Sequence, residues 1–335
     1  MNMISRSNAN LEKALFRFLF CIFISLSTVE TFAVYTPVSA SLVSDTSGNI
    51  IYSSNANLKT QPASLTKMMT LLLVFKALEQ RKISFSTKIK ISQNAASQSP
   101  CMLGLKCGEY ISMRDAILAL ITKSANDIAV AIAEHIGKSE KKFVRMMNKE
   151  AKRLNMNSTT FQNPSGWKNP QQLTTAKDMA KLSKALICEY PGYYGLFSTK
   201  SFCYRKEVIK NHNNLLKKKG EDIVVDGIKT GFLNASGFNI AASAVRGKKR
   251  LIVIVLGGKT ARERDIKAYL LIKKAFSKLL SQEILKSRVY HKKNAKKSIK
   301  TLISNQVDFS STAALLSDKE IESKKNEQST INSTK

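Results

Sequence analysis

Gln61-Pro-Ala-Ser-Leu-Thr-Lys-Met-Met-Thr70 is the stretch around which the rest of the chain is organised. A proline and an alanine precede Ser64, and an apolar run follows, which predicts a buried helix from Ser64 to about Gln80. Ser64 and Lys67 are three residues apart and therefore share one helix face. A hydroxyl needs a base before it can attack a carbonyl, and a buried lysine with a lowered pKa can be that base. Because the pair is common, an N-cap serine beside a surface lysine is the alternative interpretation.

Length and charge limit the class of protein. The 335 residues can form one large domain or two ordinary ones, and a hydrophobic content of 43% is typical of a globular protein. The formal net charge of +30 indicates a polyanionic partner, such as nucleic acid, an anionic membrane surface or an acidic polymer. A lysine-rich, solvated surface without such a partner is the alternative.

The N-terminal residues predict export. Basic residues flank a short apolar run from Leu15 to Leu26, and small residues suited to cleavage follow at Ala33 and Ala40. The run is shorter than a typical membrane span, so we expect a signal peptide over residues 1–33, with a retained signal anchor as the alternative. The mature chain would then lie in the periplasm or on the outer face of the cytoplasmic membrane. Nucleic acid is not an expected partner there.

Four cysteines follow the predicted signal peptide: Cys101, Cys107, Cys188 and Cys203. In an oxidising compartment they allow three disulfide pairings, between which the sequence does not choose, and free thiols are equally compatible with it. No spacing of cysteine or histidine is typical of a metal site. We therefore expect neither a metal nor a cofactor.

The order of strand-like and helix-like segments predicts an α+β fold. A hairpin is expected over residues 38–53 and another over 237–256, and the terminal strands would share one antiparallel sheet. Shorter strands are expected over 82–93 and 202–210, and residues 224–231 are expected to approach a turn. Helices are expected over 112–121, 128–136, 138–154, 175–189 and 261–280.

The C-terminal residues differ in composition from the rest. Residues 286–300 hold seven basic residues and no acidic one, and residues 304–335 are mostly polar. We therefore predict one domain over 34–282 and a basic, largely disordered tail over 283–335. The tail could contact an anionic membrane surface.

Three short motifs, each common by itself, occur in an order and a structural context that make the set informative about function. A Ser-x-x-Lys pair begins the buried helix, a Ser-x-Asn pair lies in a loop between two helices, and Lys-Thr-Gly precedes a hairpin. Their residues are Ser64 and Lys67, Ser124 and Asn126, and Lys229, Thr230 and Gly231. The final glycine would let a substrate backbone approach closely. The set resembles the penicillin-recognising serine acyltransferases and β-lactamases.

The local sequence resembles one group more narrowly, the low-molecular-mass D-alanyl-D-alanine carboxypeptidases of the penicillin-binding-protein-5-like group (serine peptidase family S11). The resemblance covers about Ser39 to Leu280 and is carried by QPASLTKMMT, LALITKSANDIAVAIAE, TTAKDMAKLSKAL and VDGIKTGF. It implies a β-lactamase/transpeptidase-like fold, an antiparallel sheet flanked by helices with an adjoining all-helical region. It also implies D-Ala-D-Ala stem peptides of peptidoglycan as substrate and β-lactam antibiotics as acylating inhibitors.

The resemblance also implies roles for single residues. Ser64 would attack the penultimate D-Ala carbonyl, Lys67 would take its proton, and Ser124 would relay a proton to the leaving amine. Asn126 would bind the substrate amide. The backbone N–H groups of Ser64 and Phe232 would form the oxyanion hole.

The terminal carboxylate of the substrate would be bound by Lys229 and Thr230. Arg264 resembles the additional carboxylate-binding arginine of the family, with the nearby Arg262 as the alternative. Two features depart from the family pattern. Phe232 stands where some relatives have histidine, and residues 281–335 are too few and too polar for the C-terminal β-rich domain of many relatives.

Other functions fit the sequence less well. A class A β-lactamase needs Glu-x-x-Leu-Asn, whereas Glu150-Ala-Lys-Arg-Leu-Asn155 is one residue too long. A D,D-endopeptidase would use the same residues on a neighbouring bond. A non-enzymatic peptidoglycan-binding envelope protein would not need the complete set of motifs.

Overall fold

The computed structural model describes residues 39–218 and 222–331, apart from some side chains of the C-terminal helix. The described residues all belong to one compact unit. The predicted signal peptide lies outside the described residues. The predicted division between a domain ending at 282 and a tail remains a prediction.

A five-stranded antiparallel sheet forms the centre of this unit, in the order β2-β1-β9-β8-β7. The N-terminal hairpin joins the C-terminal strands through the pairing of β1 with β9, which confirms the predicted α+β arrangement. The strands are β1 (Ala40–Asp45), β2 (Ile50–Ser54), β7 (Val224–Leu233), β8 (Gly237–Arg246) and β9 (Lys249–Gly258).

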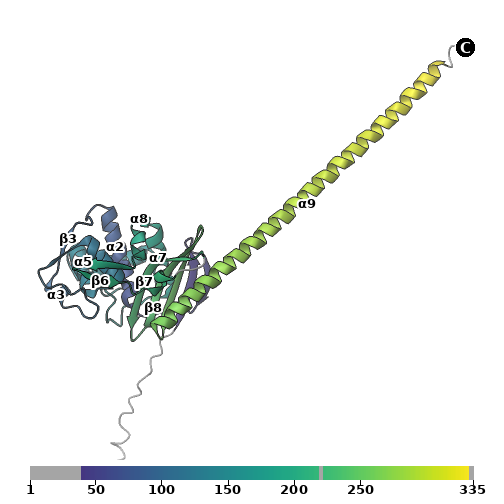
Figure 1. The fold of residues 1–335 in the computed structure, drawn as a ribbon. Coiled ribbons are helices and arrows are strands. Elements are labelled where there is room, and N and C mark those ends of the chain that lie inside the picture. The colour runs from purple at the N-terminus through teal and green to yellow at the C-terminus, as the bar shows by residue number, and fades with distance from the viewer. Residues whose placement is uncertain (1–38, 219–221, 332–335) are drawn as a thin grey trace, which may run out of the picture. The chain divides into compact units, whose positions relative to one another are not determined.

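Both faces of this sheet are covered. In β9, Leu251, Val253 and Val255 pack toward the C-terminal helix α9, whereas the residues between them belong to a larger core shared with the other helices. This follows from the two-residue period of a strand, and it explains why β9 is almost entirely apolar. Figure 1 shows α9 along one face of the sheet, with α2, α5 and α7 on the other side.

The helical region holds the predicted buried helix at its centre. The short 3₁₀ turn η1 (Ala63–Thr66) leads into α2 (Lys67–Glu79), and all but two residues of α2 are buried, which explains its lack of a polar face. The other longer helices of this region are α4 (Met113–Thr122), α5 (Asn126–Gly137), α6 (Glu140–Arg153) and α7 (Ala176–Cys188).

Three strand predictions need correction. Of residues 82–93, only β3 (Lys88–Lys90) forms a strand, paired with β4 (Tyr110–Ser112). Residues 202–210 form a hairpin instead of one strand, because Arg205 and Lys206 both have positive φ and reverse the chain. Residues 224–231 do not approach a turn but belong to the ten-residue strand β7.

Short elements complete the described chain. They are α3 (Gln93–Ala96), α8 (Pro191–Tyr194), η2 (Gly195–Ser198), β5 (Ser201–Tyr204), β6 (Glu207–Lys210) and η3 (Asn214–Lys217). The four described cysteines are free and exposed, so none of the three possible disulfide pairings is formed.

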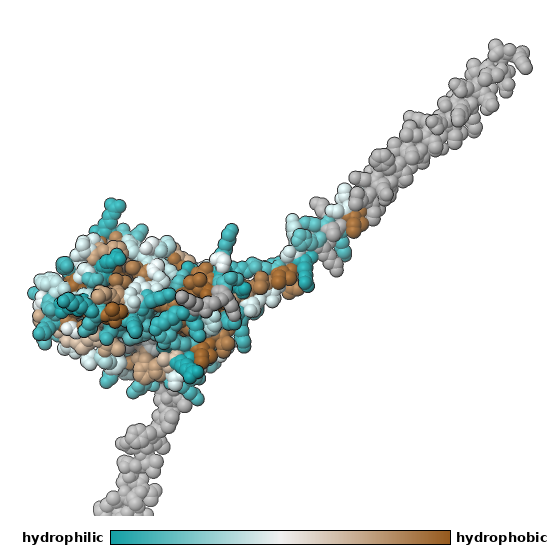
Figure 2. Space-filling model, viewed as in Figure 1, coloured by the Kyte–Doolittle hydropathy of each residue, from teal (hydrophilic) through white to brown (hydrophobic). Residues whose placement is uncertain are grey.

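The last helix, α9 (Ala261–Ile331), continues past the predicted end near Leu280. Its apolar contact with the sheet does end there, because the apolar stripe that packs on β8 and β9 runs from Ala268 to Leu279 at helical spacing, and one turn further Glu283 still pairs with Lys249 of β9. Beyond the stripe, Ile284 and Leu285 are exposed, and Figure 2 shows apolar side chains among polar ones at this part of the surface. Among the described helices, none combines the length and apolarity needed to cross a membrane.

Candidate active site

Ser64 and Lys67 meet at the start of the buried helix. The Lys67 side chain is fully buried, and its Nζ lies 3.1 Å from Ser64 Oγ, 2.7 Å from Asn126 Oδ1 and 2.6 Å from the backbone oxygen of Ser165. No carboxylate is among these contacts. Burial lowers the pKa of Lys67 well below its usual value of 10.5, and the nearby Lys229 lowers it further. The structure therefore brings the predicted base to the predicted nucleophile in surroundings that favour a neutral amine.

The Ser-x-Asn pair lies in the turn between α4 and α5. Asn126 is fixed on both sides of its amide, because Nδ2 donates to the oxygen of Pro100 at 2.7 Å while Oδ1 accepts from Lys67. Ser124 has a φ of 62° and is 4% exposed, and its Oγ is buried without a hydrogen-bond partner among the described residues. A buried hydroxyl without a partner costs free energy, and this one lines the cleft, where it is free to donate or accept a hydrogen bond.

The strand β7 passes directly beside the helix start that carries Ser64. A Cβ on Gly231 would lie 2.9 Å from the Ser64 nitrogen and 3.2 Å from that of Leu65. Only glycine permits this approach without displacement of the strand or of η1. The approach places Thr230 and Phe232 at the edge of the cleft in front of Ser64.

Lys229 lies behind this edge. Side chains alternate along a strand, so Lys229 shares the face of β7 on which Gly231 meets Ser64, and Thr230 lies on the opposite face. It is 1% exposed, its Nζ donates to the backbone oxygen of Thr230 at 2.8 Å, and its pKa is lowered to about 7, chiefly by burial and also by Arg264. The described residues give it no carboxylate partner.

Arg264 reaches the same cleft from the first turn of α9. The residue is 4% exposed, and its guanidinium donates to Asp265 Oδ1 through Nε at 2.9 Å and Nη2 at 2.7 Å. Arg262 is exposed and does not line the cleft. The geometry thus favours Arg264 over its neighbour.

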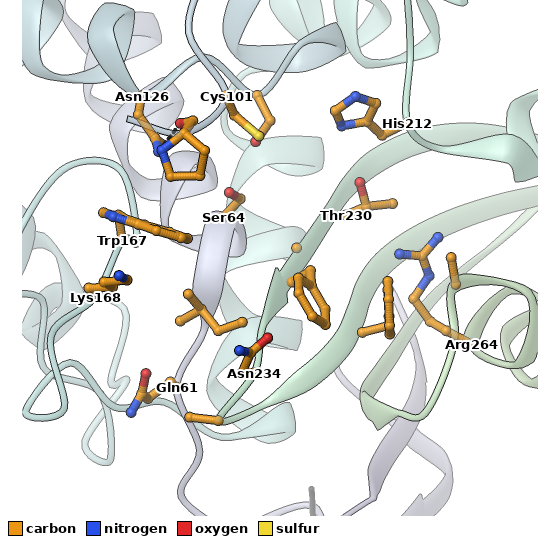
Figure 3. Close-up of a pocket in the computed structure, with 18 residues that line it drawn as sticks. Gln61, Ser64, Cys101, Asn126, Trp167, Lys168, His212, Thr230, Asn234 and Arg264 are labelled. Carbon is orange, nitrogen blue, oxygen red and sulfur yellow. Dashed lines mark hydrogen bonds between the residues drawn. The ribbon is translucent and has the colours of Figure 1, made fainter. Parts of the chain in front are cut away.

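These groups surround a cleft of about 520 Å³, shown in Figure 3. Seven of the nine predicted site residues line it, and Lys67 and Lys229 lie beneath its surface. The lining residues are Gln61, Ser64, Pro100, Cys101, Ser124, Asn126, Trp167, Lys168, His212, Thr230, Gly231, Phe232, Leu233, Asn234, Ala235, Phe238, Ala261 and Arg264.

The sequence did not reveal the contribution of the loop between α6 and α7. Its Ser165 carbonyl accepts from Lys67, and a Cβ on Gly166 would lie 1.8 Å from the oxygen of Ala63, so this glycine lets the loop close over the helix start. The Asn-Pro-Ser-Gly sequence from Asn163 to Gly166 does predict a turn, but not what the turn touches.

Three further cleft residues, Cys101, Trp167 and His212, were also missed. The exposed Cys101 lies in the loop whose backbone holds Asn126. His212 keeps an exposed part of its side chain, and partial desolvation and the charge of Lys229 lower its pKa to about 4, so its imidazole is neutral at pH 7. A lone cysteine or histidine in a sequence carries no signal for such a position.

Comparisons with known proteins point to one family. A family model described as D-alanyl-D-alanine carboxypeptidase (Peptidase_S11) matches residues 30–260. The D-alanyl-D-alanine carboxypeptidase DacC of Escherichia coli (strain K12) is 39% identical over 224 residues, which cover 65% of this chain and 56% of DacC. The chain thus spans less than two thirds of the length of this relative.

Two solved structures show the same fold. Penicillin-binding protein 5 from Haemophilus influenzae has a TM-score of 0.69 and 33% identity, with 75% of this chain and 73% of that one covered. Penicillin-binding protein D2 from Listeria monocytogenes, in its cefotaxime-bound form, has a TM-score of 0.64 and 30% identity, with 71% and 96% covered. The predicted β-lactamase/transpeptidase-like fold is therefore confirmed, and the chain belongs to the D-alanyl-D-alanine carboxypeptidase family of serine peptidases, S11.

Proposed function

We propose that the protein is a serine-type D-Ala-D-Ala carboxypeptidase that removes the terminal D-alanine from peptidoglycan stem pentapeptides through an acyl-enzyme on Ser64. The observation that carries this proposal is the set of three contacts made by the Lys67 amine. Two of its partners, Asn126 Oδ1 and the Ser165 carbonyl oxygen, can only accept hydrogen bonds. The third, Ser64 Oγ, can also donate one.

These partners suit a neutral lysine. A neutral amine has two N–H donors and one lone pair, so its donors are used by Asn126 and Ser165 and its lone pair is left for the proton of Ser64. After proton transfer, the ammonium has three donors and can hold the Ser64 oxygen as well. Positioned proton transfer of this kind accelerates reactions by about 10²–10⁴-fold.

The oxygen of Ser64 then bonds to the penultimate D-Ala carbonyl carbon. The negative charge on the carbonyl oxygen would be met by the backbone N–H groups of Ser64 and Phe232, since β7 passes close to η1 at Gly231. A donor of this type contributes about 3–4 kcal/mol to transition-state stabilisation. When the C–N bond breaks, the leaving amine takes a proton through Ser124, whose hydroxyl has no described partner to lose. Water hydrolyses the ester and frees Ser64.

The terminal carboxylate would be held at the end of the cleft formed by Thr230 and Arg264. Lys229 lies behind Thr230 and adds positive charge there, while it also helps to keep Lys67 neutral. The amide of the substrate would be bound near Asn126. β-Lactam antibiotics would acylate the same serine, because they present a strained amide and a carboxylate to these groups. Neither a metal nor a cofactor enters any step.

We also propose that the chain is exported and acts in the periplasm or on the outer face of the cytoplasmic membrane. Between the two candidate cleavage positions, Ala33 fits better, since Ala40 is the first residue of β1 and is buried in the sheet.

An anionic membrane surface is a proposed partner of α9, in which Leu280, Ile284 and Leu285 are exposed ahead of the basic segment 286–300. Binding to phosphatidylglycerol vesicles but not to phosphatidylcholine vesicles would support this contact.

The function is tested by the release of D-alanine from a stem pentapeptide. We expect wild-type protein to release one D-alanine per peptide and Ser64→Ala to release none above the uncatalysed rate. Cleavage of cross-linked dimeric peptides without D-alanine release would instead show that the protein is an endopeptidase. Binding of peptidoglycan without either product would assign a non-enzymatic envelope protein.

A further inference from the structure

We propose that Trp167 and Lys168 form a subsite for a carboxylate on the side chain of the residue that precedes the D-Ala-D-Ala pair of the substrate. This inference rests on the carboxypeptidase function proposed above and narrows its substrate class. It is drawn from the place of Lys168 in the cleft, from the charges around it and from the loop that holds it.

The two ends of the cleft are distinguished by their position relative to Ser64. In Figure 3, Trp167 and Lys168 lie on one side of Ser64, while Thr230 and Arg264 lie on the other. The terminal carboxylate belongs to the side of Thr230 and Arg264. A substrate whose scissile carbonyl is at Ser64 must therefore direct its preceding residues toward Trp167 and Lys168.

The charges of the cleft favour an anion at both ends. Among the residues that line it there is no aspartate or glutamate, and its basic side chains Lys168 and Arg264 lie on opposite sides of Ser64. Arg264 is paired with Asp265, which does not line the cleft. In the described part of the chain, Lys168 forms no ion pair. Its Nζ lies instead 5.2 Å from the centre of the Trp167 ring. This cation–π contact holds the ammonium at the cleft without neutralising it.

The loop that carries the subsite is fixed to the catalytic groups. The Trp167 oxygen accepts from Asn163 Nδ2 at 2.7 Å, and the Trp167 nitrogen donates to Ser165 Oγ at 3.2 Å. The oxygen of the same Ser165 accepts from Lys67. The position of the subsite relative to the reacting amine is therefore set by short chains of hydrogen bonds, which a specificity site requires.

The chemistry of the two side chains defines the group that they would bind. The indole ring provides an apolar surface for the methylene groups of a substrate side chain, and the lysine ammonium provides a point charge for a carboxylate at its end. A side chain with methylene groups and a terminal carboxylate would use both. A neutral side chain would use the ring alone and would bind less well.

The test compares peptides that differ only in this charge. The kcat/KM for D-alanine release is measured with N-acetyl-X-D-Ala-D-Ala, where X is 2-aminopimelate or its side-chain amide, and again where X is glutamate or glutamine. For at least one pair, we expect wild-type protein to prefer the acid by about three- to fivefold, the scale of an exposed ion pair. The ratio should approach one in Lys168→Gln, persist in Lys168→Arg and invert in Lys168→Glu.

A matched control separates the subsite from the general positive charge of the protein. Lys141 is exposed on α6 and does not line the cleft, so Lys141→Gln should keep the wild-type ratio. A wild-type ratio of one for both peptide pairs, or an unchanged ratio in Lys168→Gln, would overturn the subsite while the carboxypeptidase function stands. If none of the four peptides released D-alanine, both the carboxypeptidase function and the subsite would be contradicted.

Discussion

Lys67 Nζ lies 3.1 Å from Ser64 Oγ, on an amine that is fully buried and has no carboxylate within hydrogen-bond distance. A buried ammonium is usually paired with an acid. Here the largest effect of a neighbouring charge on its pKa is that of Lys229, which has the same sign, and the opposing effect of Asp127 is smaller. The free energy of this arrangement favours proton loss from Lys67, which is the property that a general base needs at neutral pH.

The unpartnered hydroxyl of Ser124 predicts that its removal lowers activity without lowering stability. Because Ser124 Oγ is buried without a described partner, Ser124→Ala should leave the free energy of unfolding unchanged or raise it. The same change should slow acylation by penicillin about 10²–10⁴-fold, since the proton relay is lost. Thermal unfolding and the rate of penicillin acylation measure the two effects. A clear loss of stability would mean that the hydroxyl has a structural partner.

The contact between β7 and η1 predicts a strict need for glycine at position 231. A Cβ there would lie 2.9 Å from the Ser64 nitrogen, so Gly231→Ala should shift the strand relative to the nucleophile and reduce the acylation rate by about 10- to 100-fold. Gly192→Ala is the matched control, because its Cβ would meet no atom within 4 Å. Equal acylation rates in the two variants would show that β7 does not need to approach Ser64.

Arg264 should matter for substrates that end in a carboxylate. The variant Arg264→Gln is expected to raise KM for D-Ala-D-Ala peptides about tenfold or more, as for the loss of a charge-assisted hydrogen bond, with a smaller change in kcat. Arg262→Gln should stay within about twofold of wild type, since Arg262 is exposed outside the cleft. Similar KM values for the two variants would show that Arg264 does not bind the terminal carboxylate of the substrate.

The lowered pKa of Lys229 predicts how stability depends on pH. The folded-state pKa is about 7, against 10.5 for an exposed lysine, so the unfolded chain binds a proton between these values that the folded chain has released. The penalty for the buried charge is therefore fully present below pH 7 and is relieved as the pH rises from about 7 to 10.5. Lys229→Met should be more stable than wild type at pH 6, by up to several kcal/mol, and this advantage should shrink by pH 10.

Denaturant unfolding of wild type and Lys229→Met at pH 6, 8 and 10 measures this difference. Lys229→Arg serves as the comparison, because arginine keeps its charge over the whole range. A stability difference between wild type and Lys229→Met that stays constant from pH 6 to 10 would show that Lys229 does not titrate in this window.

The parts of the site that are local in sequence could be predicted from the sequence. The Ser64–Lys67 pair needed only the spacing of one helical turn, and the burial of α2 followed from its apolar run. The two hairpins and their shared sheet followed from apolar strands and turn residues. These features depend on neighbours along the chain, which a single sequence displays.

Contacts between distant segments could not be predicted in this way. The carbonyl of Ser165 that binds Lys67 lies 98 residues further along the chain, and a backbone oxygen has no signature in a sequence. Nothing in the sequence distinguishes Lys168 from the other lysines, because only the fold of its loop brings it to the cleft. Residues 224–231 were expected to approach a turn, and they form most of the strand β7 although glycines such as Gly227 and Gly231 usually weaken a strand. Both glycines instead make room for close neighbours, Tyr194 and Ser64 respectively.

The most direct test of the account is covalent labelling by a fluorescent penicillin, with the site of the adduct located by mass spectrometry, in wild type and in Lys67→Arg. Arginine keeps the positive charge but cannot act as a base, because its guanidinium stays protonated over the whole pH range in which the protein is studied. We predict one adduct, on Ser64, in wild type and a rate lower by about 10²–10⁴-fold in the variant. Folded wild-type protein without an adduct on Ser64, or Lys67→Arg labelled at the wild-type rate, would contradict the account.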